Sequence, residues 1–243
     1  MLIKDVADKL TKWLETELEE SGAKSFIVGL SGGIDSAVVA ALCKRVRPND
    51  TYGIIMPCYS NPQDAKDAQL LEDALGINVK TVVLDEVFDV LLSKITDECY
   101  EDNITNLTFA NIKPRLRMTT LYFYAAKYHG LVVGTSNKTE LTVGYFTKYG
   151  DGGCDLLPLA NLVKEDVFEL AKILGVPEPI INKPPSAGLW SGQDDEKEMG
   201  ITYRELDDYL KTGQAEPRVK KIVDELNRKS EHKRRLPPKP PKF

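Results

Sequence analysis

The feature that most constrains the fold is an alternation of short apolar runs with segments of helical periodicity, between residues 25 and 175. The apolar runs predict strands at 25–30, 51–57, 79–85 and 131–136. These runs are short and nearly continuous, which is typical of parallel strands buried on both faces. The segments that separate and follow them predict helices at about 35–47, 62–75, 86–95, 111–130 and 162–175.

Strands that alternate with helices form βαβ units, whose crossovers place helices on both faces of a parallel sheet. The chain therefore predicts an α/β fold with a Rossmann-like, open and mostly parallel sheet. Its length of 243 residues suits one large domain, and we expect a single domain over 1–243. Before the first strand, apolar residues recur at helical spacing and predict an amphipathic helix over 1–20.

Several residue types mark where these helices begin and end. Asn61 and Pro62 are types favoured at the cap and at the first position of a helix. Gly76 and Gly175 predict helix ends, because glycine adopts the left-handed conformation there without strain. His129 precedes a glycine at another helix end, where we expect it to serve as a cap.

Beyond residue 175 the pattern is less regular. Residues 176–200 are proline-rich and polar, so we expect a long loop without regular structure. Two short helices are predicted at 202–211 and 217–229. The tail, 230–243, is basic and rich in proline, a composition typical of disorder unless a ligand binds.

Charge and composition exclude several classes of function. The net charge of −5 disfavours non-specific binding to nucleic acid. No apolar run approaches the length of about 20 residues that a membrane span needs, and the charged N-terminus is unlike a signal peptide. The four cysteines, Cys43, Cys58, Cys99 and Cys154, are widely spaced. We therefore expect reduced thiols, not disulfides or a zinc site, in a cytoplasmic protein.

A glycine-rich turn, GLSGGIDSA, connects the first strand to the next helix. Glycines let the backbone approach an anion, and the N–H groups at the start of a helix point toward it. The spacing fits neither a lysine-containing phosphate loop nor a dinucleotide glycine fingerprint. Asp35 would repel a bare phosphate, but it makes sense if it holds Mg²⁺ that bridges phosphate oxygens. A plain glycine turn is the alternative.

The segment Ser31-Gly32-Gly33-Ile34-Asp35-Ser36 resembles the SGGxDS pyrophosphate loop of the ATP pyrophosphatases. Enzymes of that group split ATP between its α and β phosphates and adenylate a carboxylate or carbonyl oxygen. The resemblance implies a fold similar to that of the adenine nucleotide alpha hydrolases. The loop alone fits several members, among them GMP, asparagine and argininosuccinate synthetases, tRNA-modifying enzymes and NAD synthetase.

Five further segments resemble NAD synthetases, in the same order and over nearly the whole chain. They are KPRLRM (113–118), VGTSNKTE (133–140), GYFTKYGDGGCDLLPLANLVK (144–164), PPSAGLWSGQDDEKEMG (184–200) and EHKRR (231–235). The resemblance implies that ATP adenylates the nicotinate carboxylate of deamido-NAD and that ammonia then displaces AMP to give NAD. Because no segment resembles the glutaminase domain of glutamine-dependent forms, it implies the ammonia-dependent form.

The resemblance also implies the residues that bind ATP and Mg²⁺. The implied ATP contacts are Gly29, Leu30, Ser31, Gly32, Gly33, Ile34, Asp35, Ser36, Thr135, Lys164 and Ser186. The implied Mg²⁺ ligands are Asp35 and Glu140. Lys164 would stabilise charge on the leaving pyrophosphate. The alternatives are a helix-start carboxylate for Glu140, a solvated lysine for Lys164 and a helix cap for Thr135, with Ser136 competing for that cap.

The same resemblance implies contacts to deamido-NAD from Arg115, Lys148, Asp155, His232 and Lys233. A substrate with a pyrophosphate and a carboxylate needs cationic partners, and arginine can bind such groups with two parallel hydrogen bonds.

Three further expectations concern Arg117, Asp151 and the tail. Arg117 is a neighbour that could share the binding of deamido-NAD, and Asp151 is a candidate for orienting or deprotonating the ammonium ion. No catalytic residue is assigned. We expect the tail to be mobile without substrate and ordered with it.

Two questions of assembly and function stay open at this point. The resemblance implies a homodimer, for which the aromatic and aliphatic residues of 115–126 could supply an interface, although they could equally pack in the core. The alternatives in function are another adenylating enzyme, such as a tRNA-modifying one, and a nucleotide sensor without turnover. A tRNA-modifying enzyme would be expected to have paired cysteines and a basic surface, which this sequence lacks.

Overall fold

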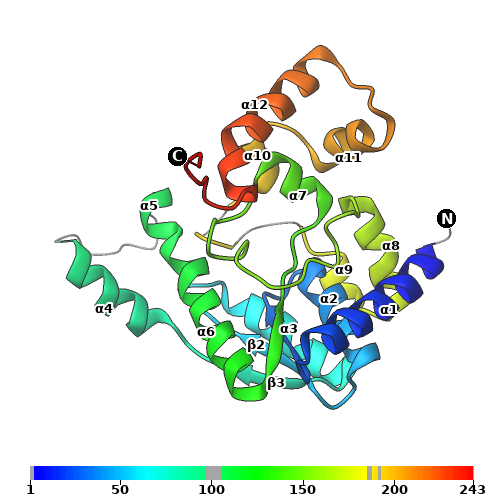
Figure 1. The fold of residues 1–243 in the computed structure, drawn as a ribbon, viewed down its shortest axis with the longest axis vertical. Coiled ribbons are helices and arrows are strands. Elements are labelled where there is room, and N and C mark those ends of the chain that lie inside the picture. Colours follow the sequence, from blue (N-terminus) through cyan, green and yellow to red (C-terminus); the bar gives the residue numbers. More distant parts are fainter. Residues whose placement is uncertain (1–2, 97–105, 185–187, 191–192, 243) are drawn as a thin grey trace.

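Four parallel strands form the centre of the structure (Figure 1). The computed structural model describes residues 3–96, 106–184, 188–190 and 193–242. The strands are β1 (Ser25–Leu30), β2 (Thr51–Ile55), β3 (Asn78–Thr81) and β4 (Gly130–Val133), in the order β3-β2-β1-β4. Neighbouring strands pair in parallel. The predicted parallel sheet is therefore confirmed, although β2, β3 and β4 end before their predicted limits.

Helices cover both faces of the sheet, as the fold class requires. One core contains Phe26 and Val28 of β1, and the other contains Ile27 of the same strand, because successive side chains of a strand point to opposite faces. The first core is completed by α1 (Ile3–Ser21), α2 (Ile34–Val46), α3 (Pro62–Leu75) and α8 (Lys164–Leu174). The second is completed by α4 (Asp85–Ile95), α5 (Leu107–Ala110) and α6 (Ile112–Tyr128).

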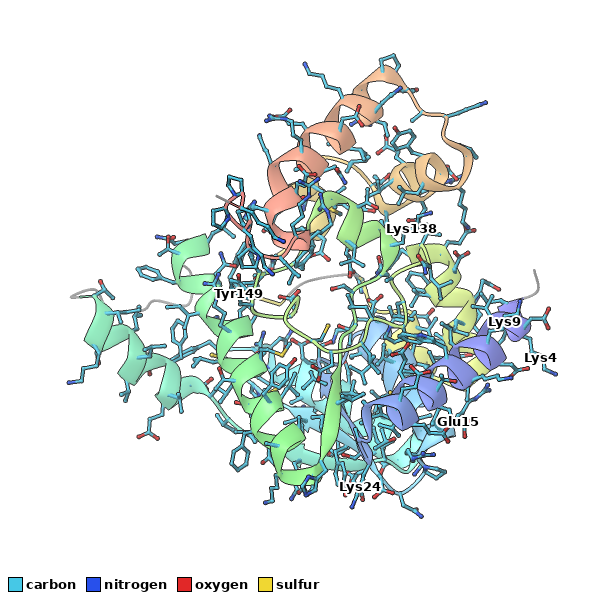
Figure 2. The ribbon with its side chains drawn as sticks, viewed as in Figure 1. Lys4, Lys9, Glu15, Lys24, Lys138 and Tyr149 are labelled. Atoms are coloured by element: carbon cyan, nitrogen blue, oxygen red, sulfur yellow. The ribbon has the colours of Figure 1, made fainter. Side chains whose placement is uncertain are left out.

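The first helix is amphipathic, as its sequence predicts. Leu14 and Leu18 are fully buried against the core. Lys4, Lys9 and Glu15 lie on its exposed face (Figure 2). Among the helices in the described residues, none combines the length and the apolar character needed to cross a membrane.

The predicted helix boundaries are confirmed where local chemistry sets them. The Asn61 side chain caps α3 and accepts a hydrogen bond from the Gln63 amide at 2.9 Å. Gly76 and Gly175 end their helices with φ of +63° and +74°. His129 caps the end of α6 with φ of +51°, an uncommon value for a residue other than glycine.

A third and smaller core lies at the end of the molecule where α11 and α12 are labelled in Figure 1. It joins α7 (Lys138–Val143), α10 (Asp195–Met199), α11 (Tyr203–Thr212) and α12 (Pro217–Arg234). Val143, Leu206 and Val223 are among its buried side chains. The helices predicted at 202–211 and 217–229 are thus confirmed, while α5 and α7 were not predicted.

The expectation that 176–200 lacks regular structure is wrong within the residues that the structure describes. This segment contains α9 (Glu178–Ile181) and α10. Pro179 occupies the first turn of α9, a position where proline costs no hydrogen bond, and the Asp194 side chain caps α10. Proline therefore starts a helix here, whereas its abundance suggested only irregular structure.

The predicted start of the tail at residue 230 is also wrong, because α12 continues to Arg234. Ser230 is buried against α7, and the Lys233 ammonium donates to the carbonyl oxygens of Gly144 and Phe146, both at 2.8 Å. These tertiary contacts stabilise a helical end that composition alone does not predict.

The packing of α12 on α7 can be tested at Gly144. A Cβ atom there would overlap the Ser230 side chain, whereas Gly213, with a similar positive φ, has nothing within 4 Å of the equivalent position. Gly213→Ala is therefore a control for backbone strain, expected to lower the free energy of unfolding by about 1 kcal/mol. We expect Gly144→Ala to lower it by about 1–3 kcal/mol more. Urea denaturation measures both, and equal losses would contradict this packing.

Candidate active site

The sheet order brings together two loops that are far apart in the sequence. β1 has β2 on one side and β4 on the other, so the strand order reverses between β1 and β4. Ligands of open α/β sheets bind at such a switch point, beyond the carboxyl ends of the strands. The glycine loop follows β1, and residues 134–137 follow β4. The side-chain Nδ2 of Asn137 donates to Asp35 Oδ1 at 2.9 Å and so joins the two loops.

The glycine loop is held by its own serines and by α3. The Ser31 hydroxyl accepts from the Gly33 amide at 3.2 Å, and the Ser36 hydroxyl donates to the Gly33 carbonyl at 2.9 Å. Gly32 has φ of +75°, and a Cβ atom there would overlap the carbonyl of Asp64 in α3. Glycine is therefore required at this position for two independent reasons.

Not every predicted contact in the loop can come from a side chain. Leu30 and Ile34 are only 4% and 5% exposed and belong to the first core. Their contribution to a ligand is limited to backbone atoms. The cap position of α2 is occupied by Gly33, which has no side chain to accept a hydrogen bond from the helix. A helix start of this kind favours an anion.

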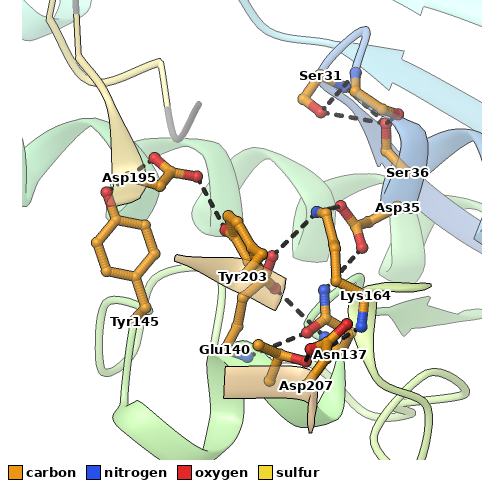
Figure 3. A network of polar contacts seen from close by, with 12 residues as sticks. Ser31, Asp35, Ser36, Asn137, Glu140, Tyr145, Lys164, Asp195, Tyr203 and Asp207 are labelled. Carbon is orange, nitrogen blue, oxygen red and sulfur yellow. Dashed lines mark hydrogen bonds and ion pairs between the residues drawn. The ribbon is translucent and has the colours of Figure 1, made fainter. Parts of the chain in front are cut away.

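A buried lysine lies between the loop and α7. The Lys164 ammonium is 2.6 Å from Asp35 Oδ2 and 3.4 Å from Glu140 Oε1 (Figure 3). Lys164 is only 4% exposed. Burial by itself lowers the pKa of Lys164, but the carboxylates of Asp35 and Glu140 outweigh burial and raise it overall. The alternative of a solvated lysine is therefore wrong, and Lys164 stays protonated near neutral pH.

Glu140 has two functions in the structure. Its side chain accepts from the backbone N–H of Asn137 at 3.3 Å, and the Asn137 side chain accepts from the backbone N–H of Glu140 at 3.0 Å. These two bonds form a capping box at the start of α7. Asn137 is thus the cap, and the alternative caps, Thr135 and Ser136, are wrong. Burial and the adjacent Asp35 raise the pKa of Glu140 to about 8. The second Glu140 oxygen remains directed at Lys164.

Asp35 and Glu140 are a suitable, but incomplete, pair of ligands for a metal ion. When Glu140 is ionised, the two carboxylates and the one lysine carry a net charge of about −1, which attracts a cation. Because the pKa of Glu140 is raised to about 8, binding of a cation near neutral pH would displace a proton from Glu140. Among the described residues there is no group of three or more His, Cys, Asp and Glu side chains that could hold a metal by themselves. Mg²⁺ commonly takes one or two carboxylates and completes its shell with phosphate and water oxygens, so the pair fits that ion.

Four of the five predicted deamido-NAD contacts surround one loop. Arg115 Nε donates to the Lys148 carbonyl at 3.3 Å, and the Lys148 ammonium donates to the His232 carbonyl at 2.7 Å. Lys233 binds two carbonyls of the same loop. Tyr149, labelled in Figure 2, lies where this loop passes between α6 and the end of α12. The structure thus gathers Arg115, Lys148, His232 and Lys233 on residues 144–153.

Asp155, the fifth, contacts the end of the sheet. Its carboxylate accepts from the Val132 amide at 2.7 Å and from the Tyr122 hydroxyl at 2.8 Å. Arg117 is directed elsewhere, toward the carbonyl of Met56 at 3.1 Å and the hydroxyl of Ser60 at 3.1 Å. Its expected role beside Arg115 is not supported by these contacts.

The remaining predicted residues are Thr135, Asp151 and Ser186. Thr135 is partly buried in the loop after β4, and Asp151 accepts from the Thr147 amide at 2.9 Å and so closes the loop of residues 147–153. Burial raises the pKa of Asp151, as a proton acceptor for ammonium would require. Ser186 and Cys99 lie outside the described residues.

The structure adds several residues that sequence reasoning missed. The Tyr203 ring lies 5.1 Å from the Lys164 ammonium, and its hydroxyl donates to Asp195 at 3.0 Å, as does that of Tyr145 at 2.9 Å (Figure 3). Asp207 joins α7 and α8. These residues follow no motif of fixed spacing, so no local signal in a single sequence could have found them.

Lys183 is a further cation beside the glycine loop that was not predicted. Its ammonium lies 2.7 Å from Asp64, 2.6 Å from Asp67 and 3.5 Å from the carbonyl of Gly32. It therefore ties the start of α3 to the segment that follows α9. Lys183 follows two isoleucines and an asparagine, and this local sequence matches no motif that would have predicted its contact with the glycine loop.

The raised pKa of Glu140 predicts a specific dependence of stability on pH. Since the folded-state pKa of about 8 exceeds the ordinary value of 4.5, the stabilisation from this group is complete below about pH 4.5 and is lost as the pH rises through about 8. Without metal, we expect the melting temperature of the unaltered protein to fall more between about pH 5 and pH 9 than that of Glu140→Gln. Parallel melting curves would contradict the assignment.

Comparisons with known proteins identify the family and agree with the fold. The NAD synthase family model matches residues 6–237. The chain is 51% identical to the NH(3)-dependent NAD(+) synthetase of Carboxydothermus hydrogenoformans over 96% of both chains. It is 40% identical to the solved NMN synthetase from Francisella tularensis, with a TM-score of 0.92 over 99% of both chains. For the NH3-dependent NAD synthetase from Campylobacter jejuni, the values are 29% identity and 0.82, over 99% of this chain and 100% of that chain. The chain belongs to the NAD synthase family.

Proposed function

We propose that the protein catalyses the ATP-dependent amidation of deamido-NAD by ammonia, which gives NAD, AMP and pyrophosphate. The observation that carries this proposal is the Lys164 ammonium, buried between Asp35 of the glycine loop and Glu140 of α7. Such a fixed cation suits a reaction in which negative charge develops on a leaving pyrophosphate. Family membership supports the substrate and the ammonia dependence.

The reaction has two steps. A nicotinate carboxylate oxygen bonds to the α-phosphorus of ATP while the bond from that phosphorus to the pyrophosphate oxygen breaks. Ammonia then bonds to the acyl carbon, AMP leaves, and the nitrogen loses a proton to give the amide. In this scheme the glycine loop and the start of α2 hold the pyrophosphate, and Lys164 stabilises its charge. Asp151 is the candidate acceptor for the proton of the nucleophile.

Asp35 and Glu140 would hold Mg²⁺. When bound, the ion would supply positive charge that neutralises the phosphate oxygens of ATP. It would also relieve the repulsion between the two carboxylates, which contributes to the raised pKa of Glu140.

The dinucleotide would occupy the region around residues 144–153. Arg115 of α6 and His232 and Lys233 of α12 contact this loop, which itself carries Lys148. Asp155 lies where the loop rejoins the sheet edge. Cationic groups of this kind suit a pyrophosphate and a carboxylate. We also propose a cytoplasmic location, supported by the free thiols of Cys43, Cys58 and Cys154.

One comparison favours a second candidate substrate. The structure with a TM-score of 0.92 is an NMN synthetase, and NMN is the amide of nicotinic acid mononucleotide. The same adenylation and amidation would convert that smaller acid, because the nicotinate carboxylate is common to both substrates. The family assignment, in contrast, gives no support to a tRNA-modifying enzyme.

One assay tests the proposal and separates the two substrates. The protein is mixed with ATP, Mg²⁺ and ammonium, and with either deamido-NAD or nicotinic acid mononucleotide. Chromatography then measures the amide product and AMP. We expect NAD and AMP in equal amounts, with the higher kcat/KM for deamido-NAD. A higher kcat/KM for the mononucleotide would select the second candidate. Formation of ADP in place of AMP, or of no amide, would contradict both candidates.

The same assay tests the role of the loop carboxylate. Asp35→Ala should lower kcat by at least about 100-fold, because Mg²⁺ and Lys164 both lose a partner. Asp73→Ala, which removes an exposed carboxylate from α3, is the matched control and should leave kcat unchanged. Full activity in Asp35→Ala would mean that the loop does not position the phosphates.

We also propose that two copies of the chain pair through α4 and α6. Apolar side chains on these helices are exposed, among them Val87 at 49%, Val90 at 55%, Ile95 at 61% and Phe123 at 61%. If these side chains form one contiguous apolar surface, a second copy of the chain would cover it, since large apolar patches are unusual on a monomer. Light scattering should give twice the chain mass of 27.1 kDa. Phe123→Asp should give the monomer mass, while Thr16→Asp on α1 should not, and a fully active monomer would refute the pairing.

A further inference from the structure

The helix that carries Lys164 has only half of a cap of its own: the Asp166 side chain accepts from the Val163 backbone N–H at 3.2 Å, but no side chain at the cap position accepts from the helix in return. Lys164 is the first residue of α8, and the residue at the cap position is Val163, whose side chain has no acceptor. A helix start leaves N–H groups without partners inside the helix, and these groups need acceptors when they are buried. Two of them find acceptors elsewhere. The Lys164 amide donates to Thr139 Oγ1 at 3.1 Å, and the Glu165 amide donates to Asp207 Oδ2 at 2.8 Å.

These two acceptors form one connected chain. The Thr139 hydroxyl donates to the second oxygen of Asp207, Oδ1, at 2.6 Å. Since a hydroxyl has a single proton, Thr139 gives it to Asp207 and accepts from Lys164, so the direction of every bond is fixed. Thr139 is fully buried and Asp207 is 4% exposed. A buried carboxylate thus caps α8 from a different helix, α11, and it does so partly through α7.

The same face of α11 also touches the other end of Lys164. Tyr203 precedes Asp207 by one helical turn, so both side chains point to the same side of α11. The Tyr203 ring lies 5.1 Å from the Lys164 ammonium, and the Tyr203 hydroxyl is fixed by Asp195. Asp207 therefore contacts the backbone end of the lysine through Thr139. Tyr203 lies beside the charged end of the lysine (Figure 3).

We propose that Asp207 and Tyr203 are positioning residues that hold the Lys164 ammonium where pyrophosphate leaves, with Thr139 as the relay between Asp207 and the Lys164 backbone. The inference rests on the proposed function of Lys164. Thr139 directly precedes Glu140, so the relay also fixes the first turn of α7 relative to that of α8. The separation between Lys164 and Glu140 then depends on α11, a helix to which we assign no phosphate contact. A displacement of about 1 Å at such a group can lower the rate by about 100-fold.

A pair of variants at Thr139 tests the relay. Thr139→Ser keeps the hydroxyl, and Thr139→Val keeps the shape but removes it. We expect kcat for amide formation to fall about 10- to 100-fold in Thr139→Val, with KM for ATP changed less than about threefold, and to recover in Thr139→Ser. Asp207→Asn, which places an amide donor against Thr139 or Glu165, should behave like Thr139→Val. Equal kcat values for the Val and Ser variants would overturn the proposal.

A control separates positioning from stability. Thr202 caps α11 itself: its hydroxyl accepts from the Glu205 backbone N–H at 3.2 Å and donates to the Glu205 carboxylate at 2.9 Å, both within α11. Thr202→Ala should lower the melting temperature by about 2–4 °C without a change in kcat. If Thr139→Val or Asp207→Asn lowered the melting temperature but left kcat unchanged, as expected for Thr202→Ala, the role of Thr139 and Asp207 would be structural and the proposal would fail.

The result can be told apart from a failure of the proposed function. If the unaltered protein makes no amide, the function is wrong, whatever the variants do. Crystal structures of Thr139→Val and Thr139→Ser then test the positioning by itself. We expect the Lys164 ammonium to remain within hydrogen-bond distance of Asp35 in the serine variant and to move away in the valine variant. An unmoved ammonium in both would overturn the inference.

Discussion

The buried ion pair of Lys164 with Asp35 and Glu140 is the interaction on which the rest of the site depends. A lysine that is 4% exposed is stable only beside compensating charge, because burial alone strongly disfavours an ammonium ion. The two carboxylates supply that charge: Asp35 follows β1 at the start of α2, and Glu140 follows β4 in the first turn of α7. The pair therefore couples the glycine loop, α7 and α8. When Glu140 is ionised, the pair also leaves a negative charge that a divalent cation would neutralise.

The sheet topology makes this pairing possible. Because β4 lies beside β1 and not beside β3, the loop after β4 meets the glycine loop at the switch point. The third core then adds α11, which reaches α8 through Asp207 and the Lys164 ammonium through Tyr203. The chain after the sheet thus supports the residues of the phosphate site, while α12 brings His232 and Lys233 to residues 144–153.

Much of this arrangement could be predicted from the sequence, and the reasons differ between its parts. The strands were found because buried parallel strands need continuous apolar runs, and the ends of α3 and α8 because Asn61, Gly76 and Gly175 act through local backbone chemistry. The start of α12 was found, but its end was missed, because contacts of Ser230 and Lys233 with α7 and the following loop extend it. Within 176–200, α9 and α10 were missed because their proline and capping signals are short.

For the site, the sequence by itself determined the glycine loop, its aspartate and the chemistry that they suggest, since those properties come from adjacent residues. Likeness to a family supplied Glu140 and Lys164, but not their mutual position. Only the tertiary structure decided that Lys164 is buried between two carboxylates and that Asn137 caps α7. It also decided that Asp207 and Tyr203 support α8 from α11. These contacts join residues separated by many positions, and no local periodicity encodes them. They exist because the sheet order and the third core bring four helices to one point.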